Sequence, residues 1–137
     1  MYETFAHTAD LGLRVRAANL DELFVDAARG LTSFLVANLD AVRPVEEIHI
    51  ELEGDSLDYL LFDWLTELLY RFETEHWLFR QFDVAVAQDG KLSATCRGER
   101  MDVTRHQMDH EVKAITYHGL RVEQTHDGWF AELIVDI

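Results

Sequence analysis

The chain has 137 residues, of which 48% are hydrophobic and 28% are charged, and its formal net charge at pH 7 is −14. This length and apolar content suit one domain with a packed core and exclude a disordered acidic tail. The negative charge argues against direct binding to nucleic acid or to an anionic membrane, because both require clustered Lys and Arg. A role in nucleic-acid metabolism would therefore need a protein partner or a bound cation. The alternative is that the acidity only maintains solubility.

The single cysteine, Cys96, excludes an intramolecular disulfide and a zinc cluster built from cysteines. No apolar run approaches the roughly 20 residues that a membrane span requires. The first residues lack the basic and apolar regions of a signal peptide. We therefore expect a cytoplasmic protein that does not associate with membranes.

The first third of the chain predicts a strand and a helix. Apolar and other residues alternate over 11–16, which is typical of a strand. Asn19 and Glu22 have the spacing of a capping box, and apolar residues then follow at helical spacing to about Ala37. Gly30 inside this helix predicts close packing against a neighbouring element.

A second strand and a second helix follow. Residues 48–53 alternate between apolar and polar side chains, and Ser56 is suited to cap the helix that comes after them. This helix has the strongest apolar stripe in the sequence: Leu57, Leu60, Leu61, Trp64, Leu65, Leu68, Leu69 and Phe72. The stripe predicts core packing and not a ligand site.

The second half predicts mainly strands. Residues 82–86 and 92–96 should form a hairpin, with Asp89-Gly90 as a type I′ turn. Cys96 lies on the apolar side of that hairpin and is interpreted as a buried hydrophobic residue, not as a nucleophile. Three further strands are expected at residues 112–117, 120–124 and 129–137. This order of elements predicts a single-domain α+β fold with a largely antiparallel or mixed β-sheet packed with two main α-helices.

The last expected strand ends in two adjacent carboxylates, the Asp136 side chain and the α-carboxylate of Ile137. Strands from the two ends of a small domain often pair, which would bring Asp10 to Asp136. Three converging carboxylates repel one another unless a cation lies between them, and Ca²⁺, Mg²⁺ and Mn²⁺ prefer oxygen ligands. The spacing therefore suggests a cation site, although most of the 26 acidic residues are expected simply to face water.

Other types of site have less support. The sequence has neither a phosphate-binding glycine loop nor a nucleophile elbow. His106 and His110 have the i, i+4 spacing of metal ligands on a helix, but their segment has no apolar stripe. We therefore expect a solvated loop there.

Three segments together resemble the archease family: residues 7–10 before the first strand, residues 111–118, and the closing Asp136-Ile137. A helical segment at 58–69 is also similar, so the resemblance covers essentially the whole chain. It implies an α+β helper protein that acts with an RtcB-type RNA ligase and is not itself an enzyme. That ligase uses GTP and Mn²⁺ to join RNA ends. Archeases speed formation of its GMP intermediate, permit multiple turnover and broaden nucleotide use.

The resemblance also assigns residues. Asp10 and Asp136 match the essential aspartates of the family, and the Ile137 carboxylate matches its terminal metal ligand. The implied cofactor is a divalent cation, with calcium expected in a crystal and magnesium or manganese as alternatives. The implied partner is the ligase, with RNA reached only through it. His7, Lys113 and His118 lie in the matched motifs and are further functional candidates.

One position departs from the family pattern. Ala6 precedes His7 where relatives often have an acidic residue, so a ligand from that position would be missing. Glu3 is a candidate replacement. Two other classes of function stay open on the sequence: a metal-dependent hydrolase or nuclease that uses the same carboxylates to activate water, and a general chaperone or scaffold.

Overall fold

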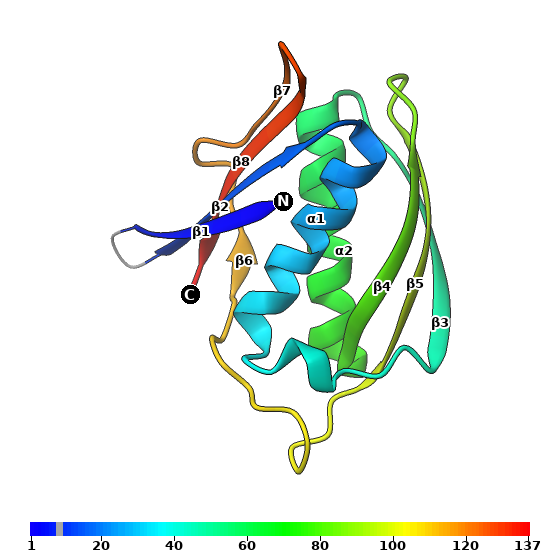
Figure 1. The fold of residues 1–137 in the computed structure, drawn as a ribbon, viewed down its shortest axis with the longest axis vertical. Helices are drawn as coiled ribbons and strands as arrows, with labels where there is room; N and C mark the ends of the chain where they lie inside the picture. Colours follow the sequence, from blue (N-terminus) through cyan, green and yellow to red (C-terminus); the bar gives the residue numbers. More distant parts are fainter. Residues whose placement is uncertain (8–9) are drawn as a thin grey trace.

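The computed structural model describes residues 1–7 and 10–137, and in this part of the chain it shows two α-helices between two antiparallel β-sheets (Figure 1). The helices are α1 (Leu20–Leu35) and α2 (Leu57–Glu75), with a short 3₁₀ helix at Leu39–Ala41. The strands are β1 (Tyr2–His7), β2 (Asp10–Ala17), β3 (Glu46–Glu53), β4 (Trp77–Val86), β5 (Lys91–Arg100), β6 (Ala114–Ile115), β7 (Arg121–Thr125) and β8 (Gly128–Asp136). The predicted α+β class with two main helices is confirmed.

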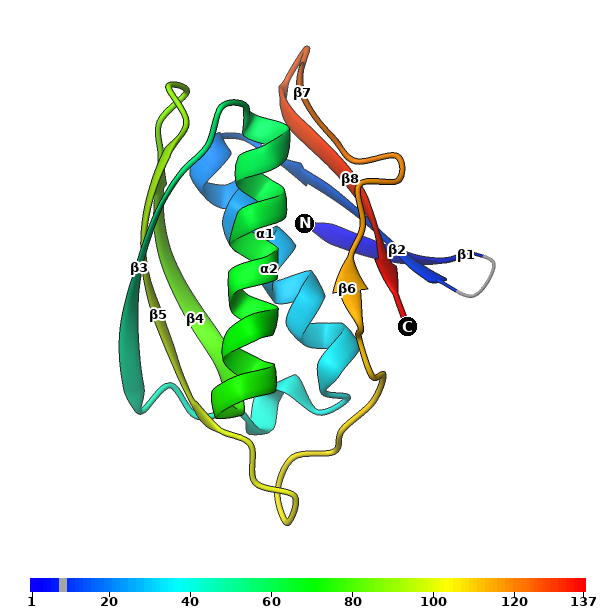
Figure 2. The ribbon, with the colours of Figure 1, turned by 180° about the vertical axis from the view of Figure 1, so that it is seen from behind.

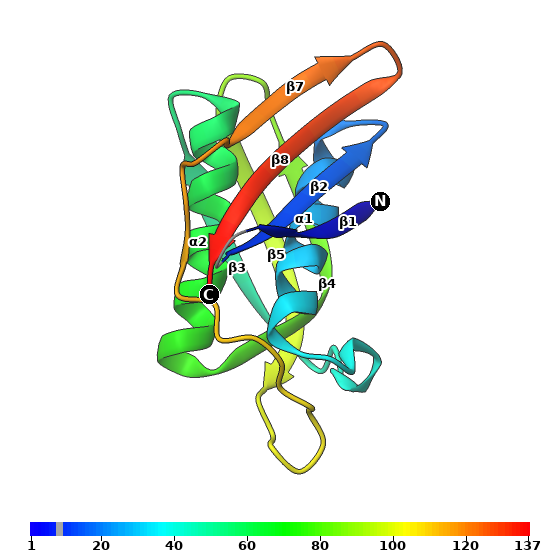
Figure 3. The same ribbon diagram turned by 90° about the vertical axis from the view of Figure 1, so that its left-hand side faces the viewer.

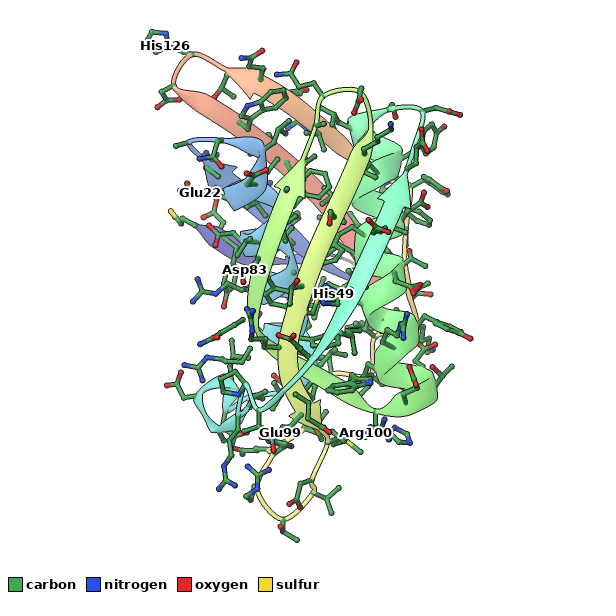
Figure 4. The ribbon with its side chains drawn as sticks, turned by 90° about the vertical axis from the view of Figure 1, so that its right-hand side faces the viewer. Glu22, His49, Asp83, Glu99, Arg100 and His126 are labelled. Carbon is green, nitrogen blue, oxygen red and sulfur yellow. The ribbon has the colours of Figure 1, made fainter. Side chains whose placement is uncertain are left out.

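The strands divide into two sheets and do not form one. A five-stranded sheet has the order β1-β2-β8-β6, with β7 also paired to β8, and a three-stranded sheet has the order β3-β5-β4. The five-stranded sheet covers the helices in Figure 3, and the three-stranded sheet covers their other side in Figure 4. Both helices therefore have neighbours on two sides.

Helix α1 begins as predicted. The Asn19 side chain accepts a hydrogen bond from the Glu22 amide at 2.9 Å, and the apolar stripe is buried. The helix ends at Leu35, two residues before the predicted end. A Cβ added to Gly30 would lie 2.5 Å from Leu13 Cδ1, so the prediction of close packing at this glycine is confirmed.

Helix α2 is capped by Ser56, whose Oγ accepts from the Tyr59 amide at 3.2 Å. Its buried stripe contains Trp64, which is fully buried and donates a 3.0 Å hydrogen bond from Nε1 to the Phe24 carbonyl of α1. The indole nitrogen is thus satisfied inside the core, and the bond fixes one helix against the other. The view from behind in Figure 2 shows α2 in front of α1 between the two sheets.

Four local predictions differ from the structure. Strand β1 was not expected, since residues 2–7 show no clear alternation. The β4–β5 hairpin is longer than predicted at its far ends, and β6 contains only two residues where six were expected. The β4–β5 turn is not type I′, because φ is positive at Gly90 (95°) but not at Asp89. The Gly90 amide donates to the Ala87 carbonyl at 3.0 Å, as in a turn that ends in a glycine bulge.

The expectation that Cys96 is a buried hydrophobic residue agrees with the structure. Cys96 is fully buried, and burial raises the pKa of its thiol to about 12 although Arg71 opposes the shift. Such a thiol is not a nucleophile at neutral pH. Among residues 1–7 and 10–137, no helix is long and apolar enough to cross a membrane.

Candidate metal centre at the end of the terminal strand

Strand β8 lies inside the five-stranded sheet and pairs with β2 along its whole length. The antiparallel register runs without interruption from Asp10 opposite Asp136 to Ala17 opposite Trp129. The predicted pairing of strands from the two ends of the chain is therefore confirmed. Residues directly opposite each other point to the same face, with Cβ atoms about 5 Å apart, so this register brings Asp10 and Asp136 together.

The core determines this register. Leu13 and Val15 of β2 and Leu133 and Val135 of β8 are all fully buried against the helices. A shift of one residue would turn these side chains outward and the polar ones inward. Asp10 and Asp136 occupy the alternate positions, so they lie on the outer face of the sheet, away from the helices.

On its other side, the end of β8 is held by β6. Ala114 is opposite Asp136, and the Lys113 amide donates to the Asp136 carbonyl at 2.8 Å. Lys113 is itself exposed. Figure 3 shows the C-terminus at the end of β8 beside the start of β2, and the β7–β8 turn, where Figure 4 labels His126, lies at the other end of β8. The carboxylate pair is therefore at one end of the sheet, with its backbone held on both sides.

The two candidate histidines, His7 and His118, differ in their position relative to the carboxylate pair. The backbone of His7 is in register with Asp10, so His7, Asp10, Asp136 and Ala114 form a row across four strands. The His7 side chain lies outside what the structure describes. His118 is exposed in the loop after β6, where its amide donates to Thr116 Oγ1 at 3.3 Å. The strand register alone does not place His118 in the row.

Two paired carboxylates suit a hard divalent cation that keeps several water ligands. Within the described residues, no group of three or more His, Cys, Asp and Glu side chains is placed to hold a metal ion. The family resemblance implies the α-carboxylate of Ile137 as a further ligand for a cation bound by Asp10 and Asp136.

The structure also bears on the departure at position 6. Ala6 is in register with Leu11, so its side chain points to the face opposite Asp10 and Asp136. Glu3 does not compensate for it. Glu3 lies four residues before His7 along β1, roughly 13 Å away, and its carboxylate pairs with Arg16 at 3.1 Å.

A second group of polar residues was missed at the sequence level. His106 is not in a solvated loop as expected but is buried, with only 3% of its surface exposed. Its Nδ1 accepts from the Asp102 amide at 2.8 Å, so Nε2 carries the proton and donates to Glu99 Oε2 at 2.9 Å. His110 is exposed and the segment is not helical, so the two histidines do not share a ligand.

Glu99, at the end of β5, is the centre of this group (Figure 4). Its side chain accepts hydrogen bonds from the Arg43 amide at 2.7 Å, from Arg105 and from His106. Burial alone would raise the pKa of Glu99, but these hydrogen bonds together lower it to about 2. The group fastens the 101–109 loop to the body of the protein, and no periodicity in the sequence indicates it.

Fold and site together define an acidic α+β protein with two helices between two antiparallel sheets and two aspartates paired at the end of its terminal strand. The model of the Archease protein family (MTH1598/TM1083) matches residues 2–137. Protein archease of Methanopyrus kandleri is 43% identical, with 99% of each chain covered. Protein archease of Pyrococcus furiosus is 41% identical, with 99% of this chain and 98% of the relative covered. The chain belongs to the archease family.

Solved structures agree with this assignment. The solution structure of protein 1598 of Methanobacterium thermoautotrophicum superposes with a TM-score of 0.86 at 32% identity, and covers 99% of this chain and 98% of its own. A crystal structure from Thermotoga maritima, described as an archease and possible chaperone, has a TM-score of 0.66 at 17% identity, with 100% of this chain and 98% of its own covered. At that identity, the second comparison shows the fold alone.

Proposed function

We propose that this protein is an accessory factor that activates an RtcB-type, GTP- and Mn²⁺-dependent RNA ligase in tRNA splicing or RNA repair. The factor promotes guanylylation of the ligase and multiple turnover, and it broadens nucleotide use. The observation that carries the proposal is the pairing of Asp10 with Asp136 at an end of the sheet in a member of the archease family. We call this carboxylate pair and the adjoining Ile137 the acidic tip.

The charge of the protein supports a protein partner in preference to RNA. With a net charge of −14, the chain repels phosphates, but it is attracted to the basic surface that an RNA-binding ligase must have. Such attraction speeds encounter and selects the partner. RNA is therefore reached only through the ligase.

The acidic tip suits a divalent cation held by Asp10 and Asp136, with the Ile137 carboxylate as a third protein ligand. Calcium, magnesium and manganese all accept this type of oxygen donor. A bound cation would supply positive charge that phosphate oxygens can approach. The contribution of the chain itself is rigid placement, since Asp136 is held by β2 on one side and by the Lys113 amide on the other.

Ligation assays at limiting ligase, with Mn²⁺ and GTP, test the role of the acidic tip. Asp10→Asn and Asp136→Asn keep the side-chain shape but remove charge, and we expect each to reduce stimulation at least about tenfold, which corresponds to ~1.4 kcal/mol. Asp83→Asn on the distant three-stranded sheet is the matched control and should stimulate normally. A folded Asp136→Asn variant with full stimulation would overturn the proposal.

The role of Ile137 is tested separately by extension of the chain. A short tag after Ile137 replaces its carboxylate with an amide and crowds the acidic tip, so we expect reduced stimulation. The same tag placed before Met1 is the control, because the N-terminal ammonium contacts Asp26 and the Arg16 carbonyl, which lie at the other end of β2 from Asp10. Full stimulation of the ligase by the C-terminally tagged protein would show that the Ile137 carboxylate is not a ligand. The role of the aspartate pair would then depend on the Asp10→Asn and Asp136→Asn variants.

The same samples separate the alternatives. A metal-dependent hydrolase or nuclease would turn over RNA with Mn²⁺ when no ligase is present. A general chaperone would suppress aggregation of unrelated unfolded proteins, and Asp136→Asn would not affect it. Either result, in the absence of ligase stimulation, would exclude the accessory role and support the corresponding alternative.

A further inference from the structure

A cluster of aromatic rings is displayed on the surface where α2 meets the loop after β6. Tyr117 stacks on Phe62, with ring centroids 4.0 Å apart and an interplanar angle of 14°, and it meets Tyr59 edge-on at 5.7 Å. Tyr59 is 53% exposed and Tyr117 is 58% exposed. Aromatic rings stacked in this way are usually buried, so their exposure here marks a candidate binding surface. We call Tyr59, Phe62 and Tyr117 the aromatic patch.

Two hollows flank the aromatic patch. One has a volume of about 490 Å³ and is lined by Asp58, Tyr59, Tyr117 and Leu120. The other has a volume of about 340 Å³ and is lined by Glu53, Gly54, Asp55, Tyr59, Asp63 and Tyr117. The two tyrosines line both hollows. A ligand can therefore contact both rings from either side.

The charge around the patch has one sign. The hollows are lined by four carboxylate residues, Glu53, Asp55, Asp58 and Asp63, and none of their lining residues, all within the described part of the chain, is Lys or Arg. One of the four, Asp58, also accepts a 2.6 Å hydrogen bond from the Val122 amide. Phosphate groups are disfavoured here, whereas a guanidinium or ammonium group gains from aromatic faces and carboxylates together.

We propose that the aromatic patch docks an Arg- or Lys-bearing segment of a protein partner. The cationic groups lie against Tyr59 and Tyr117 and pair with the carboxylates of the hollows. Tyr117 follows Ala114, the residue opposite Asp136, by only three positions, so one short segment links the patch to the acidic tip. Where the partner is the ligase, which rests on the proposed function, the patch supplies affinity and the acidic tip supplies stimulation.

The first test needs no ligase. The full chain, labelled with ¹⁵N, is titrated with a peptide of alternating Gly and Arg and followed by amide chemical shifts. We expect the shifts to concentrate at Tyr59, Phe62, Tyr117 and the hollows, and a peptide with Glu in place of Arg to bind at least about tenfold more weakly. Shifts spread evenly over the acidic surface would overturn the proposal.

Variants make this test specific. Tyr59→Ala with Tyr117→Ala should weaken peptide binding at least about tenfold, whereas Tyr117→Phe, which keeps the ring, should bind as the native chain does. Tyr70→Ala is the matched control, because Tyr70 is 56% exposed on α2 about three turns beyond Tyr59. Unchanged binding by the folded double variant would refute a role for the rings.

The second test uses the ligase and separates the two roles. The double tyrosine variant should raise the Kd for the ligase at least about tenfold and leave stimulation at saturation unchanged. Asp136→Asn should leave the Kd unchanged and reduce stimulation at saturation. A double variant that binds the ligase as tightly as the native chain would exclude the patch as the ligase contact. If the native chain does not bind the ligase, the proposed function fails, and the peptide titration still decides whether the patch binds basic segments.

Discussion

At the scale of single residues, Glu99 shows how a buried carboxylate stabilises a loop that has little apolar content. In the unfolded chain its pKa is near the ordinary value of 4.5, and in the folded protein its hydrogen bonds lower the pKa to about 2. A lowered pKa means that the folded state favours the ionised form. The contribution of Glu99 to stability is therefore complete above about pH 4.5 and is lost as the pH falls toward 2.

We expect Glu99→Gln to lower the free energy of unfolding at pH 7 by about 2–3 kcal/mol, because the hydrogen bonds from Arg105, His106 and the Arg43 amide lose their charged acceptor. The difference from the native chain should shrink as the pH approaches 2. Urea unfolding at pH 7 and pH 3 measures both effects. Asp83→Asn is the control, since Asp83 is exposed and its surface ion pair with Arg97 contributes little to stability. A Glu99→Gln variant as stable as this control would contradict the assignment.

At the scale of elements, the contact of α1 with β2 connects the core to the acidic tip. Gly30 leaves room for Leu13, and Leu13 is paired with Leu133 in the register that places Asp10 beside Asp136. The position of the carboxylates thus depends on a helix that does not touch them. Because the core has little empty space, a change in how α1 packs on Leu13 would shift β2 and with it Asp10.

We expect Gly30→Val to destabilise the protein by about 1–3 kcal/mol, since the added methyl groups collide with Leu13. Thermal or urea unfolding measures the loss. Arg29→Val is the matched control, because it adds the same side chain to the exposed face of the same helical turn and should cost no more than about 1 kcal/mol. Equal losses in the two variants would show that α1 can move away from β2 without cost.

At the scale of the whole molecule, the charge of −14 should govern encounter with a basic partner. We expect the association rate with the ligase to fall at least about tenfold as salt rises from roughly 50 to 500 mM, because screening shortens the range of the attraction. The dissociation rate should change less. Stopped-flow or surface-binding kinetics measures both rates.

Paired charge removals determine which part of the surface steers the encounter. Asp55→Asn with Asp63→Asn, beside the aromatic patch, should slow association more than Glu46→Gln with Glu51→Gln, which removes the same charge from exposed positions on β3. Equal effects would indicate that only the total charge matters. An association rate that does not respond to salt would exclude steering altogether.

Much of the local structure was predictable from the sequence. Asn19 and Ser56 mark the starts of the helices because short polar side chains satisfy the free amides there, and the apolar spacing that follows identifies the buried faces. Alternation located most strands, and the position of Cys96 within one predicted its burial. These features depend on neighbours a few residues away.

The prediction of Asp10 beside Asp136 was correct, but the sequence did not determine it. Acidic residues are numerous in this chain, and only the pairing of β2 with β8 selects these two. Their metal-binding role stays a prediction.

Periodicity by itself determined which face of each element is buried. Tertiary structure alone decided how the strands divide into two sheets, why His106 lies inside and not in solvent, and how Tyr117 comes to cover Phe62 beside Tyr59. The physical reason is that a hydrophobic face specifies burial but not the partner that buries it, and a hydrogen bond such as His106 to Glu99 forms only after distant segments meet.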